Sequence, residues 1–373
     1  MPTSKPKVLH IIARLNVGGT ARYLDNLVPG LQEGGYEVLV ATGHVQGSEI
    51  EDEAVIRLPI HRIPTLGRKI SVVNDFKARR AIKKLILDYK PDIIQSHTFK
   101  AGLLTRTFKC GIPKIHTFHG HLFNDPEFQG KKKYPVMLIE RMLASHANQL
   151  ITVGDQVKHD LLSYKIGKPD QFISVVPGVR QIDFQDRKHS LIEFGLENET
   201  RPIVVWMARI TAVKGPEHVV KLAKALPNVR FLMVGGGDLF EIIKQNAPDN
   251  LTLLGWQSPE KIWPLADIAI STSKNEGIPI AIIESQMAGI PTIAINVGAI
   301  SQIVIDRETG ILVMDKNEEL ISGIRTLVED LDLRETYGKN AKRNFDSKFR
   351  IDIFVVEYLR LYSDLLSKRA IRN

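Results

Sequence analysis

The chain alternates strand-like and helix-like patterns along nearly its whole length, and this alternation constrains the fold more than any other feature. Short apolar runs such as 203–208 are typical of buried strands, and longer amphipathic stretches such as 74–89 are typical of helices. Repeated strand–helix units predict parallel sheets that helices cover on both faces. We expect strands at residues 8–12, 37–42, 92–97, 114–119, 149–153, 172–176, 203–208, 229–234, 251–255, 268–272 and 291–296.

The alternation is interrupted near the middle of the chain. Pro177 and Gly178 break the pattern, and a polar stretch follows at 180–201 before the strands resume. A chain of 373 residues is long for one hydrophobic core and fits two domains. The sequence therefore predicts an α/β protein with two doubly wound, Rossmann-like domains and a cleft between them. We expect the domains at 1–180 and 181–350, with a C-terminal helix at 351–373 that packs back toward the first domain.

Two carboxylates stand eight residues apart in the second half of the chain. Glu276 is followed by Gly277, Ile278, Pro279 and Ile280, and Glu284 closes the motif. Proline suits the first turn of a helix, so we expect Glu276 in a loop and Glu284 on the helix that follows. The free N–H groups at the start of that helix suit an anion such as a diphosphate. Two solvated glutamates around a core helix remain the alternative.

Two cations follow a predicted buried strand of the same half. Arg209 comes directly after the strand at 203–208, and Lys214 stands before the helical pattern at 217–226. Both residues therefore belong at the carboxyl end of a strand, which is the usual ligand side of an open α/β sheet. Arginine binds phosphate in a fork and lysine acts as a mobile point charge. With the two glutamates, they indicate a site for a phosphorylated polyol, although two surface cations would also satisfy the pattern.

The combined motifs closely resemble the retaining nucleotide-sugar glycosyltransferases of family 4, which adopt the GT-B architecture. The resemblance rests on Arg209-(four residues)-Lys214-Gly215 and Glu276-Gly-Ile-Pro-(four residues)-Glu284, and it covers essentially the whole chain. Gly18-Gly19, Thr117-Phe118-His119-Gly120 and Val234-Gly235-Gly236-Gly237 fall in the corresponding order. The family often has a carboxylate in the turn after the next strand, where this chain has Gln302. We assign that turn no function.

The resemblance implies transfer of a sugar from a nucleotide diphosphate sugar, with UDP the commonest nucleotide, to a glycan or lipid-linked acceptor. Such a reaction fits bacterial surface polysaccharide or cell-envelope biosynthesis. The implied catalytic residues are His119, Arg209, Lys214 and Glu276. The implied donor-binding residues are Gly18, Gly19, Arg209, Lys214, Gly235, Gly237, Trp256, Glu276, Gly277, Ile278, Pro279, Ile280 and Glu284.

The resemblance also assigns roles. Arg209 and Lys214 would stabilise the departing diphosphate, Glu284 would bind the ribose, and Glu276 would hold sugar hydroxyls. His119 would orient the sugar from the other domain. The diphosphate itself would take the proton of the acceptor, so no protein general base is named. GT-B enzymes generally work without a bound metal, and we expect no cofactor.

Two other classes of function stay open. A nucleotide-sugar 2-epimerase shares the GT-B architecture but lacks the Arg–Lys and Glu–Glu pattern in this form. A catalytically silent partner subunit would bind the donor without turning it over. The intact Arg209, Lys214, Glu276 and Glu284 argue against the silent subunit.

Metal and disulfide chemistry find little support in the sequence. His116, His119 and His121 lie close together, but side chains at 116 and 119 point to opposite faces of a continuing strand. Cys110 is the single cysteine, which excludes an intramolecular disulfide and a cysteine metal cluster. We therefore expect no metal site and a reducing, cytoplasmic location.

Charge is distributed unevenly along the chain. Residues 1–180 carry 26 Lys and Arg against 16 Asp and Glu, a net charge of +10, whereas residues 181–373 carry 24 against 26, a net charge of −2. The helix expected at 74–89 sets lysines and arginines against an apolar face that includes Phe76. A basic amphipathic helix fits an anionic membrane surface, with a solvated helix face as the alternative. No nucleic-acid module accompanies the charge, so we expect a protein attached peripherally, if at all, to the inner face of the plasma membrane.

Overall fold

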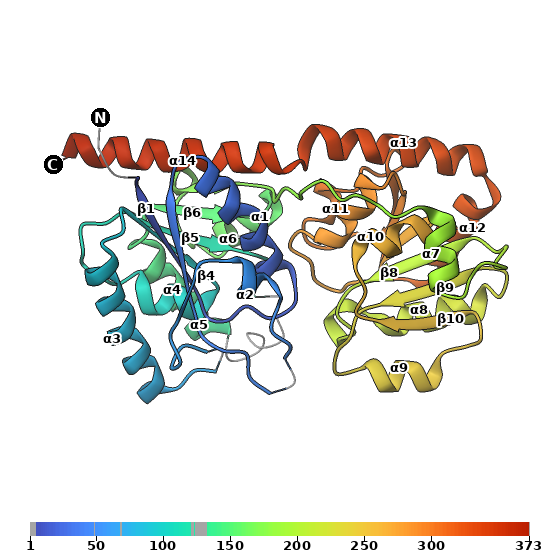
Figure 1. Ribbon diagram of the computed structural model, residues 1–373, viewed down its shortest axis with the longest axis horizontal. Helices are drawn as coiled ribbons and strands as arrows, with labels where there is room; N and C mark the ends of the chain where they lie inside the picture. Colours follow the sequence, from blue (N-terminus) through green and yellow to red (C-terminus); the bar gives the residue numbers. More distant parts are fainter. Residues whose placement is uncertain (1–4, 48, 68, 121–122, 124–132, 373) are drawn as a thin grey trace. The chain divides into compact units, whose positions relative to one another are not determined.

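The computed structural model describes residues 5–47, 49–67, 69–120, 123 and 133–372, and the chain divides into two compact units (Figure 1). Unit 1 comprises residues 1–178 together with 351–373, and unit 2 comprises residues 179–350. Each unit contains one parallel sheet with helices packed against it. We describe each unit by itself.

The sheet of unit 1 has seven strands in the order β3-β2-β1-β4-β5-β6-β7. All neighbouring strands in it pair in parallel, so their carboxyl ends meet at one edge of the sheet. The central strands are almost completely buried, as expected for a sheet with helices on both faces. The strands are β1 (Lys7–Ile12), β2 (Glu37–Thr42), β3 (Ile60–Arg62), β4 (Ile93–His97), β5 (Lys114–Phe118), β6 (Gln149–Thr152) and β7 (Phe172–Ser174).

The helices of unit 1 include one from the far end of the chain. The helix α14 (Ile351–Arg372) packs against α1 (Gly19–Glu33), where Gly30 leaves room for it, since a Cβ there would lie 2.3 Å from Val355 Cγ2. Figure 1 shows α14 running beside α1 along unit 1. The other described helices of the unit are α2 (Ala54–Arg57), α3 (Val72–Tyr89), α4 (Phe99–Thr105), α5 (Lys133–Ala144), α6 (Asp155–Ser163) and the 3-10 turn η4 (Pro169–Gln171).

The sheet of unit 2 has six strands in the order β10-β9-β8-β11-β12-β13, and these also pair in parallel. The strands are β8 (Ile203–Met207), β9 (Arg230–Val234), β10 (Leu251–Gly255), β11 (Ile268–Ser271), β12 (Thr292–Ile295) and β13 (Gly310–Val313). The helices are α7 (Arg187–Glu193), η5 (Ala212–Lys214), α8 (Pro216–Ala225), α9 (Phe240–Asn246), α10 (Pro259–Ile262), η6 (Trp263–Leu265), α11 (Ile280–Met287), η7 (Ile300–Gln302), α12 (Asn317–Glu329) and α13 (Leu331–Lys348).

The two faces of the unit 2 sheet build separate apolar clusters. Trp206 and Phe231 point to one face with the buried side of α8, and Val205 and Trp263 belong to the cluster on the other face. The strand β8 lies in the middle of this sheet, so the loop that follows its carboxyl end is held by a fully buried strand. That loop contains Arg209 and Lys214.

The predicted pair of doubly wound sheets is confirmed, and the expected strands occur within a few residues of their predicted bounds. The strand β5 ends at Phe118, one residue before its predicted bound, and α11 begins directly after Pro279, its N-cap. One local prediction was wrong. Phe76 is 70% exposed, because the buried side of α3 consists of Ala78, Ile82, Leu85 and Ile86.

Candidate functional site

In unit 2, an ion pair joins the two sequence motifs. Lys214 Nζ lies 2.6 Å from Glu276 Oε1, and their side chains are 19% and 8% exposed. The same carboxylate oxygen accepts a hydrogen bond of 2.6 Å from Ser273 Oγ. The sequence motifs that lie 62 residues apart therefore meet at the carboxyl edge of the sheet.

The pair retains hydrogen-bonding capacity for a ligand. A lysine ammonium has three donors, and among the described residues Lys214 Nζ bonds only Glu276, which leaves up to two donors for ligand oxygens. The second carboxylate oxygen of Glu276, Oε2, accepts from none of the groups that the structure describes. The pair can therefore donate to one ligand group and accept from another.

Hydrogen bonds join the two loops that carry Lys214 and Glu276. The indole Nε1 of Trp206 donates to Thr272 Oγ1 at 2.9 Å, and that hydroxyl lies within 3.0 Å of the backbone oxygens of Lys214 and Gly215. Gly215 adopts the left-handed conformation with φ of 61°, and a Cβ there would lie 2.2 Å from Thr272 O. Only glycine fits this close approach. Ser273 and Thr272 were not among the predicted residues, although polar residues at the end of a buried strand were a visible signal.

Glu284 lies on α11, four residues after the helix begins, and is 6% exposed. Ile278 and Ile280 are buried on either side of Pro279, so they anchor the start of the helix rather than face solvent. Gly277 precedes them in the same loop. The helix start and both glutamates thus belong to one short segment between β11 and β12, as the sequence predicted.

Arg209 comes two residues after the end of β8 and is half-buried. The glycine-rich loop after β9 lies against the backbone of this segment. Gly235 has a φ of 132°, and a Cβ at this position would lie 1.9 Å from Ala208 O. The amide of Ile210 donates to Gly236 O at 2.9 Å, which fixes the two loops together. Gly237, the last of the three glycines, leads into the turn before α9.

Trp256 completes the candidate residues of unit 2. It follows β10 and is 43% exposed, and a Cβ at Gly236 would lie 2.6 Å from its Nε1 atom. An exposed indole beside a glycine loop offers a flat apolar surface for a ring. The structure therefore assembles the loops after β8, β9, β10 and β11 at one edge of one sheet.

In unit 1, the candidate residues also lie at the carboxyl edge of the sheet. Gly18 is the N-cap of α1 and Gly19 its first residue, and a Cβ at Gly19 would meet no atom within 4 Å. His119 follows β5, and its ring lies 4.7 Å from the ring of Tyr23 on α1, edge to face. Tyr23 thus connects His119 to the helix that Gly18 and Gly19 begin.

Burial favours the neutral state of four histidines in unit 1, namely His10, His97, His116 and His119. Burial lowers the pKa of His119 to about 3 and that of His10 to about 3. Burial also lowers the pKa of His97 well below its usual value, and nearby histidines add to the effect. Unlike the ion pair of unit 2, His119 therefore offers an uncharged hydrogen-bonding group.

His116 and His119 point to opposite faces of the sheet, and His116 Nδ1 lies 2.9 Å from Ser96 Oγ on the far face. His121 lies outside the described residues. Among the residues that the structure describes, no group of three or more His, Cys, Asp or Glu side chains could hold a metal ion.

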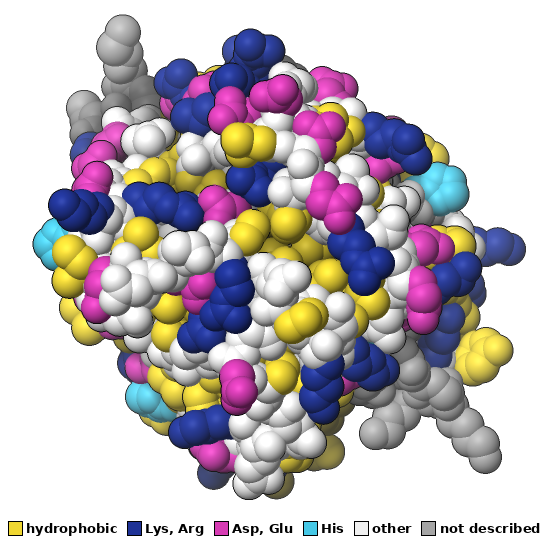
Figure 2. All heavy atoms as spheres, turned by 90° about the vertical axis from the view of Figure 1, so that its right-hand side faces the viewer, with side chains coloured by type: hydrophobic (Ala, Val, Ile, Leu, Met, Phe, Trp, Pro, Cys, Tyr) yellow, Lys and Arg dark blue, Asp and Glu magenta, His cyan; other side chains and the backbone are white. Residues whose placement is uncertain are grey.

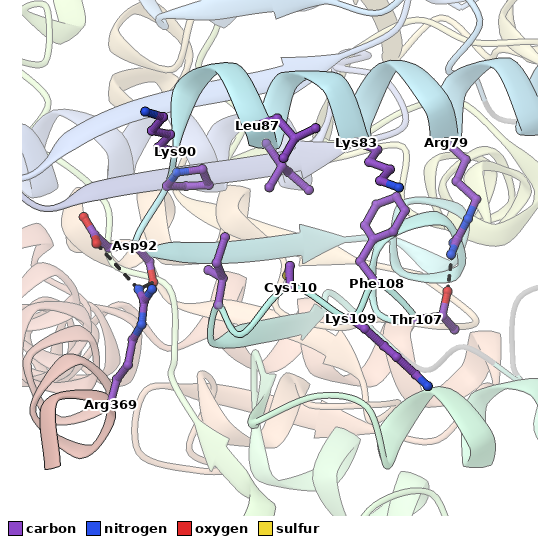
Figure 3. Close-up of a pocket in the computed structure, with 13 residues that line it drawn as sticks. Arg79, Lys83, Leu87, Lys90, Asp92, Thr107, Phe108, Lys109, Cys110 and Arg369 are labelled. Atoms are coloured by element: carbon purple, nitrogen blue, oxygen red, sulfur yellow. Dashed lines mark hydrogen bonds and ion pairs between the residues drawn. The ribbon is translucent and has the colours of Figure 1, made fainter. Parts of the chain in front are cut away.

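A separate basic pocket of about 830 Å³ lies at the opposite, amino-terminal edge of the unit 1 sheet (Figure 3). Asp92, directly before β4, lies in its wall and is 3.6 Å from Arg369 of α14. Arg79 is engaged there, because it donates to Thr107 Oγ1 at 2.8 Å and lies over the ring of Phe108. The remaining cations of the wall are Lys83, Lys90 and Lys109.

The charge asymmetry of the sequence is visible on the surface. On the face that Figure 2 presents, at the unit 2 end of Figure 1, Lys and Arg side chains alternate with Asp and Glu. In unit 1, by contrast, α3 exposes Lys77, Arg80, Lys83 and Lys84 along one helix. Within the described residues, no helix is long and apolar enough to cross a membrane.

Comparison with known families matches a separate family model to each unit. The family model described as Glycosyltransferase Family 4 matches residues 17–179, and the model described as Glycosyl transferases group 1 matches residues 188–344. Together they span both units and every candidate residue.

Individual relatives match along most of the chain. The UDP-Gal:alpha-D-GlcNAc-diphosphoundecaprenol alpha-1,3-galactosyltransferase of Escherichia coli is 27% identical over 332 residues, which cover 82% of this chain and 83% of that protein. Sucrose-phosphate synthase from Thermosynechococcus elongatus has a similar structure, with a TM-score of 0.84 at 20% identity over 98% of this chain and 100% of the other. Anabaena HepE, solved in complex with UDP and glucose, has a TM-score of 0.82 at 17% identity over 96% of this chain and 100% of the other.

Proposed function

We propose, from the premise that this chain belongs to glycosyltransferase family 4 and is a glycosyltransferase of the GT-B fold, that it transfers a sugar from a UDP-sugar with retention of configuration. The acceptor that we propose is a hydroxyl of a glycan or a lipid-linked saccharide in the synthesis of a surface polysaccharide. The observation that carries the proposal is the ion pair between Lys214 and Glu276, with Glu284 on the adjoining helix.

The charges of the unit 2 site suit a nucleotide diphosphate sugar. Lys214 has donors to spare and Arg209 lies in the same loop, so both are assigned to the oxygens of the diphosphate. Stabilisation of developing charge in this way usually contributes more to catalysis than any other single effect. Glu276 Oε2 is assigned to sugar hydroxyls and Glu284 to the ribose. Trp256 and the loop of Gly235 and Gly237 are assigned to the base and the phosphates.

The proposed reaction needs no protein base. The bond between the anomeric carbon and the diphosphate oxygen breaks, and the acceptor oxygen bonds to the same face of that carbon. The acceptor's proton passes to the diphosphate oxygen that departs. Arg209, Lys214 and the N-terminus of α11 neutralise the charge that develops on this group, so we propose no metal cofactor.

The choice of donor and acceptor rests on the named relatives. The Escherichia coli relative is named for a UDP-galactose donor and a diphosphoundecaprenol-linked acceptor, and Anabaena HepE binds UDP and glucose. These names support UDP as the nucleotide and a lipid-linked saccharide as the acceptor.

A donor screen followed by a product assay tests this function. Thermal shift with a panel of nucleotide sugars should reveal the donor, because a ligand at 100 times its Kd stabilises the folded state by about 2.7 kcal/mol. The purified protein should then transfer the sugar to a lipid-linked saccharide. A change in the sugar without acceptor would indicate an epimerase, and binding with neither hydrolysis nor transfer would indicate a silent subunit.

We also propose that unit 1 meets an anionic membrane surface through α3. Residues 73, 76, 77, 80, 84 and 87 follow helical spacing, so they share one exposed side. Phe76 and Leu87 on it are 70% and 64% exposed, and Lys77, Arg80 and Lys84 stand between them. Apolar side chains among cations are the pattern of a helix that lies in a membrane interface. A peripheral protein at the inner face of the plasma membrane would reach a lipid-linked acceptor there.

A further inference from the structure

A chain of buried polar side chains crosses the face of the unit 1 sheet that α1 and α14 cover. It begins at His119 and passes through His97 of β4 and His10 of β1 to Tyr362 of α14. His10, His97 and Tyr362 are fully buried. Fully buried polar side chains in an apolar core require partners, so their arrangement is strongly constrained.

Each link of this chain is a hydrogen bond between specific atoms. His119 Nε2 lies 2.9 Å from His97 Nδ1, and His97 Nε2 lies 2.9 Å from His10 Nδ1. His10 Nε2 lies 3.5 Å from Tyr362 Oη. A neutral imidazole has one N–H, so each ring donates through one nitrogen and accepts through the other. The direction of one link therefore fixes the direction of all the others.

Gln95 bonds Tyr362, the last residue of this hydrogen-bonded series, and sets the direction of the hydrogen bonds. Tyr362 Oη donates to Gln95 Oε1, and Gln95 Nε2 donates to Thr117 Oγ1 at 2.7 Å and Tyr358 Oη at 3.2 Å. The reversed amide would have one N–H without an acceptor at a fully buried site, whereas the observed orientation satisfies both. The single proton of Tyr362 is thus directed to Gln95, and its oxygen is left to accept from His10.

The direction follows link by link. His10 donates from Nε2 to Tyr362, so its Nδ1 accepts from His97 Nε2. His97 Nδ1 in turn accepts from His119 Nε2. The remaining nitrogen of His119, Nδ1, then carries a lone pair, and within the described part of the chain no group donates to it.

We propose that this chain holds His119 as the Nε2–H tautomer, so that its Nδ1 accepts a hydrogen bond from a hydroxyl of the bound sugar. His97, His10 and Tyr362 are then positioning residues that act through His119. The inference rests on the proposed function, in which His119 faces the sugar.

This tautomer determines the kind of ligand group that His119 recognises. A lone pair on Nδ1 attracts an O–H donor and repels a phosphate oxygen. Burial keeps the ring uncharged, because it lowers the pKa of His119 to about 3. His119 therefore selects the neutral sugar and contributes nothing to binding the diphosphate.

Nitrogen-15 NMR of the full-length protein with labelled histidine tests the tautomer directly, without substrate. The expected spectrum of the wild type has His119, His97 and His10 all protonated on Nε2. A proton on Nδ1 of His119 would overturn the proposal. This measurement does not depend on turnover, so the assigned tautomers can stand if the proposed reaction fails, and the reverse also holds.

The substitution Tyr362→Phe removes the acceptor at the end of the chain. It should convert His119 partly or wholly to the Nδ1–H tautomer and lower kcat/KM for sugar transfer by about five- to a hundredfold, the range for a mismatched buried hydrogen bond. Binding of UDP alone should not change. An unaltered tautomer in Tyr362→Phe would contradict the role of Tyr362.

Leu361→Ala is the packing control. Leu361 precedes Tyr362 on α14, is also buried, and has no polar side-chain atom. This substitution should leave the histidine tautomers as in the wild type, since it removes packing but no hydrogen-bonding group of the series. Equal loss of the Nε2–H tautomer in both variants would mean that α14 acts only through packing, against the proposal. If Tyr362→Phe does not fold, the wild-type spectrum still tests which nitrogen of His119 carries the proton.

Discussion

The candidate residues at the carboxyl edges of the two sheets differ in charge. In unit 2, Lys214 and Glu276 form an ion pair that is mostly buried but retains bonding capacity. In unit 1, the corresponding edge ends in His119, whose pKa burial lowers to about 3, so the group is neutral. The edge of unit 1 also carries an ion pair, between Arg14 and Glu49 at 2.5 Å, so the contrast concerns the candidate residues and not the whole edges.

The outer surfaces of the two units also differ in charge. The outer side of α3 in unit 1 is basic, whereas cations and anions are mixed on the unit 2 face of Figure 2. Unit 1 therefore combines neutral buried histidines with a basic outer helix, although its interior also holds the buried ion pair of Arg106 and Glu140. The following predictions test whether this contrast has the assigned consequences.

Acid should destabilise unit 1 far more than unit 2. Burial lowers the pKa of His10, His97, His116 and His119 in unit 1. Below pH 6.5 the unfolded chain takes up protons that the folded chain does not, so stability falls as pH drops toward the folded pKa of about 3. The unfolded pKa of about 6.5 lies in the middle of the interval from pH 7.5 to 5.5, so each histidine costs about 1.4 kcal/mol over the whole interval, and four of them give roughly 5 kcal/mol.

The three tryptophans make this measurable, because Trp206, Trp256 and Trp263 all belong to unit 2. Urea unfolding followed by tryptophan fluorescence reports unit 2, and circular dichroism reports both units. At pH 5.5 the dichroism transition should move to lower urea much more than the fluorescence transition. An equal shift of both signals would remove the contrast between the units.

The next largest effect should come from the cations of unit 2. Arg209→Ala or Lys214→Ala should lower kcat by about 10²–10³-fold, the usual cost of losing one charge-stabilising donor. Steady-state transfer rates with the identified donor provide the measurement, and melting temperatures show whether the fold persists.

Lys274→Ala is the matched control for Lys214→Ala. Lys274 stands in the loop after β11 and pairs with Glu217 at 2.5 Å, but both side chains are exposed, 46% and 40%. An exposed pair contributes little, so kcat should remain within about twofold of the wild type. Near-native turnover in both Lys214→Ala and Arg209→Ala would refute the assignment of the site.

The two glutamates should separate the nucleotide from the sugar. Glu284→Gln should weaken binding of UDP itself, and Glu276→Gln should weaken the UDP-sugar while leaving UDP nearly unaffected. A lost hydrogen bond to a charged group corresponds to about 1.5–3 kcal/mol, or roughly 10- to 150-fold in Kd. Calorimetry with both ligands measures this. Equal losses for UDP and UDP-sugar in either variant would contradict the assigned roles.

The sequence predicted the fold and the placement of the four charged candidate residues of unit 2, because both depend on local patterns. Arg209, Lys214, Glu276 and Glu284 all lie at strand ends or helix starts, where apolar runs and proline reveal their place. The edge strands β3 and β13 were not predicted, since each has only three or four residues and little apolar pattern. A short edge strand is defined by its neighbour rather than by its own sequence.

The ion pair and the histidine chain could not be predicted, because they depend on which side chains meet across strands. Lys214 and Glu276 were placed on one edge, but their contact at 2.6 Å needed the fastening of two loops through Thr272. His10 and Gln95 stand out in hindsight as polar residues inside apolar strands. Their partners on α14 lie more than 260 residues away, beyond the reach of local patterns.

The smallest effect per substitution should come from the surface of unit 1. Lys77, Arg80 and Lys84 are exposed on α3, and each cation near an anionic membrane contributes about 1 kcal/mol within a Debye length of about 8 Å. Changing all three to glutamine should weaken binding to vesicles that contain anionic lipid by about fivefold for each residue. Co-sedimentation at increasing salt measures the loss, and the binding of UDP should not change.

Arg79 provides the control within the same helix, since its guanidinium already donates to Leu104 O and Thr107 Oγ1 and lies over Phe108. Arg79→Gln should therefore lower the melting temperature more than it lowers vesicle binding, whereas the triple variant should do the reverse. If the wild type ignores anionic vesicles even at low salt, α3 is a solvated face. The contrast between the units would then be limited to their interiors, and a soluble acceptor would be favoured.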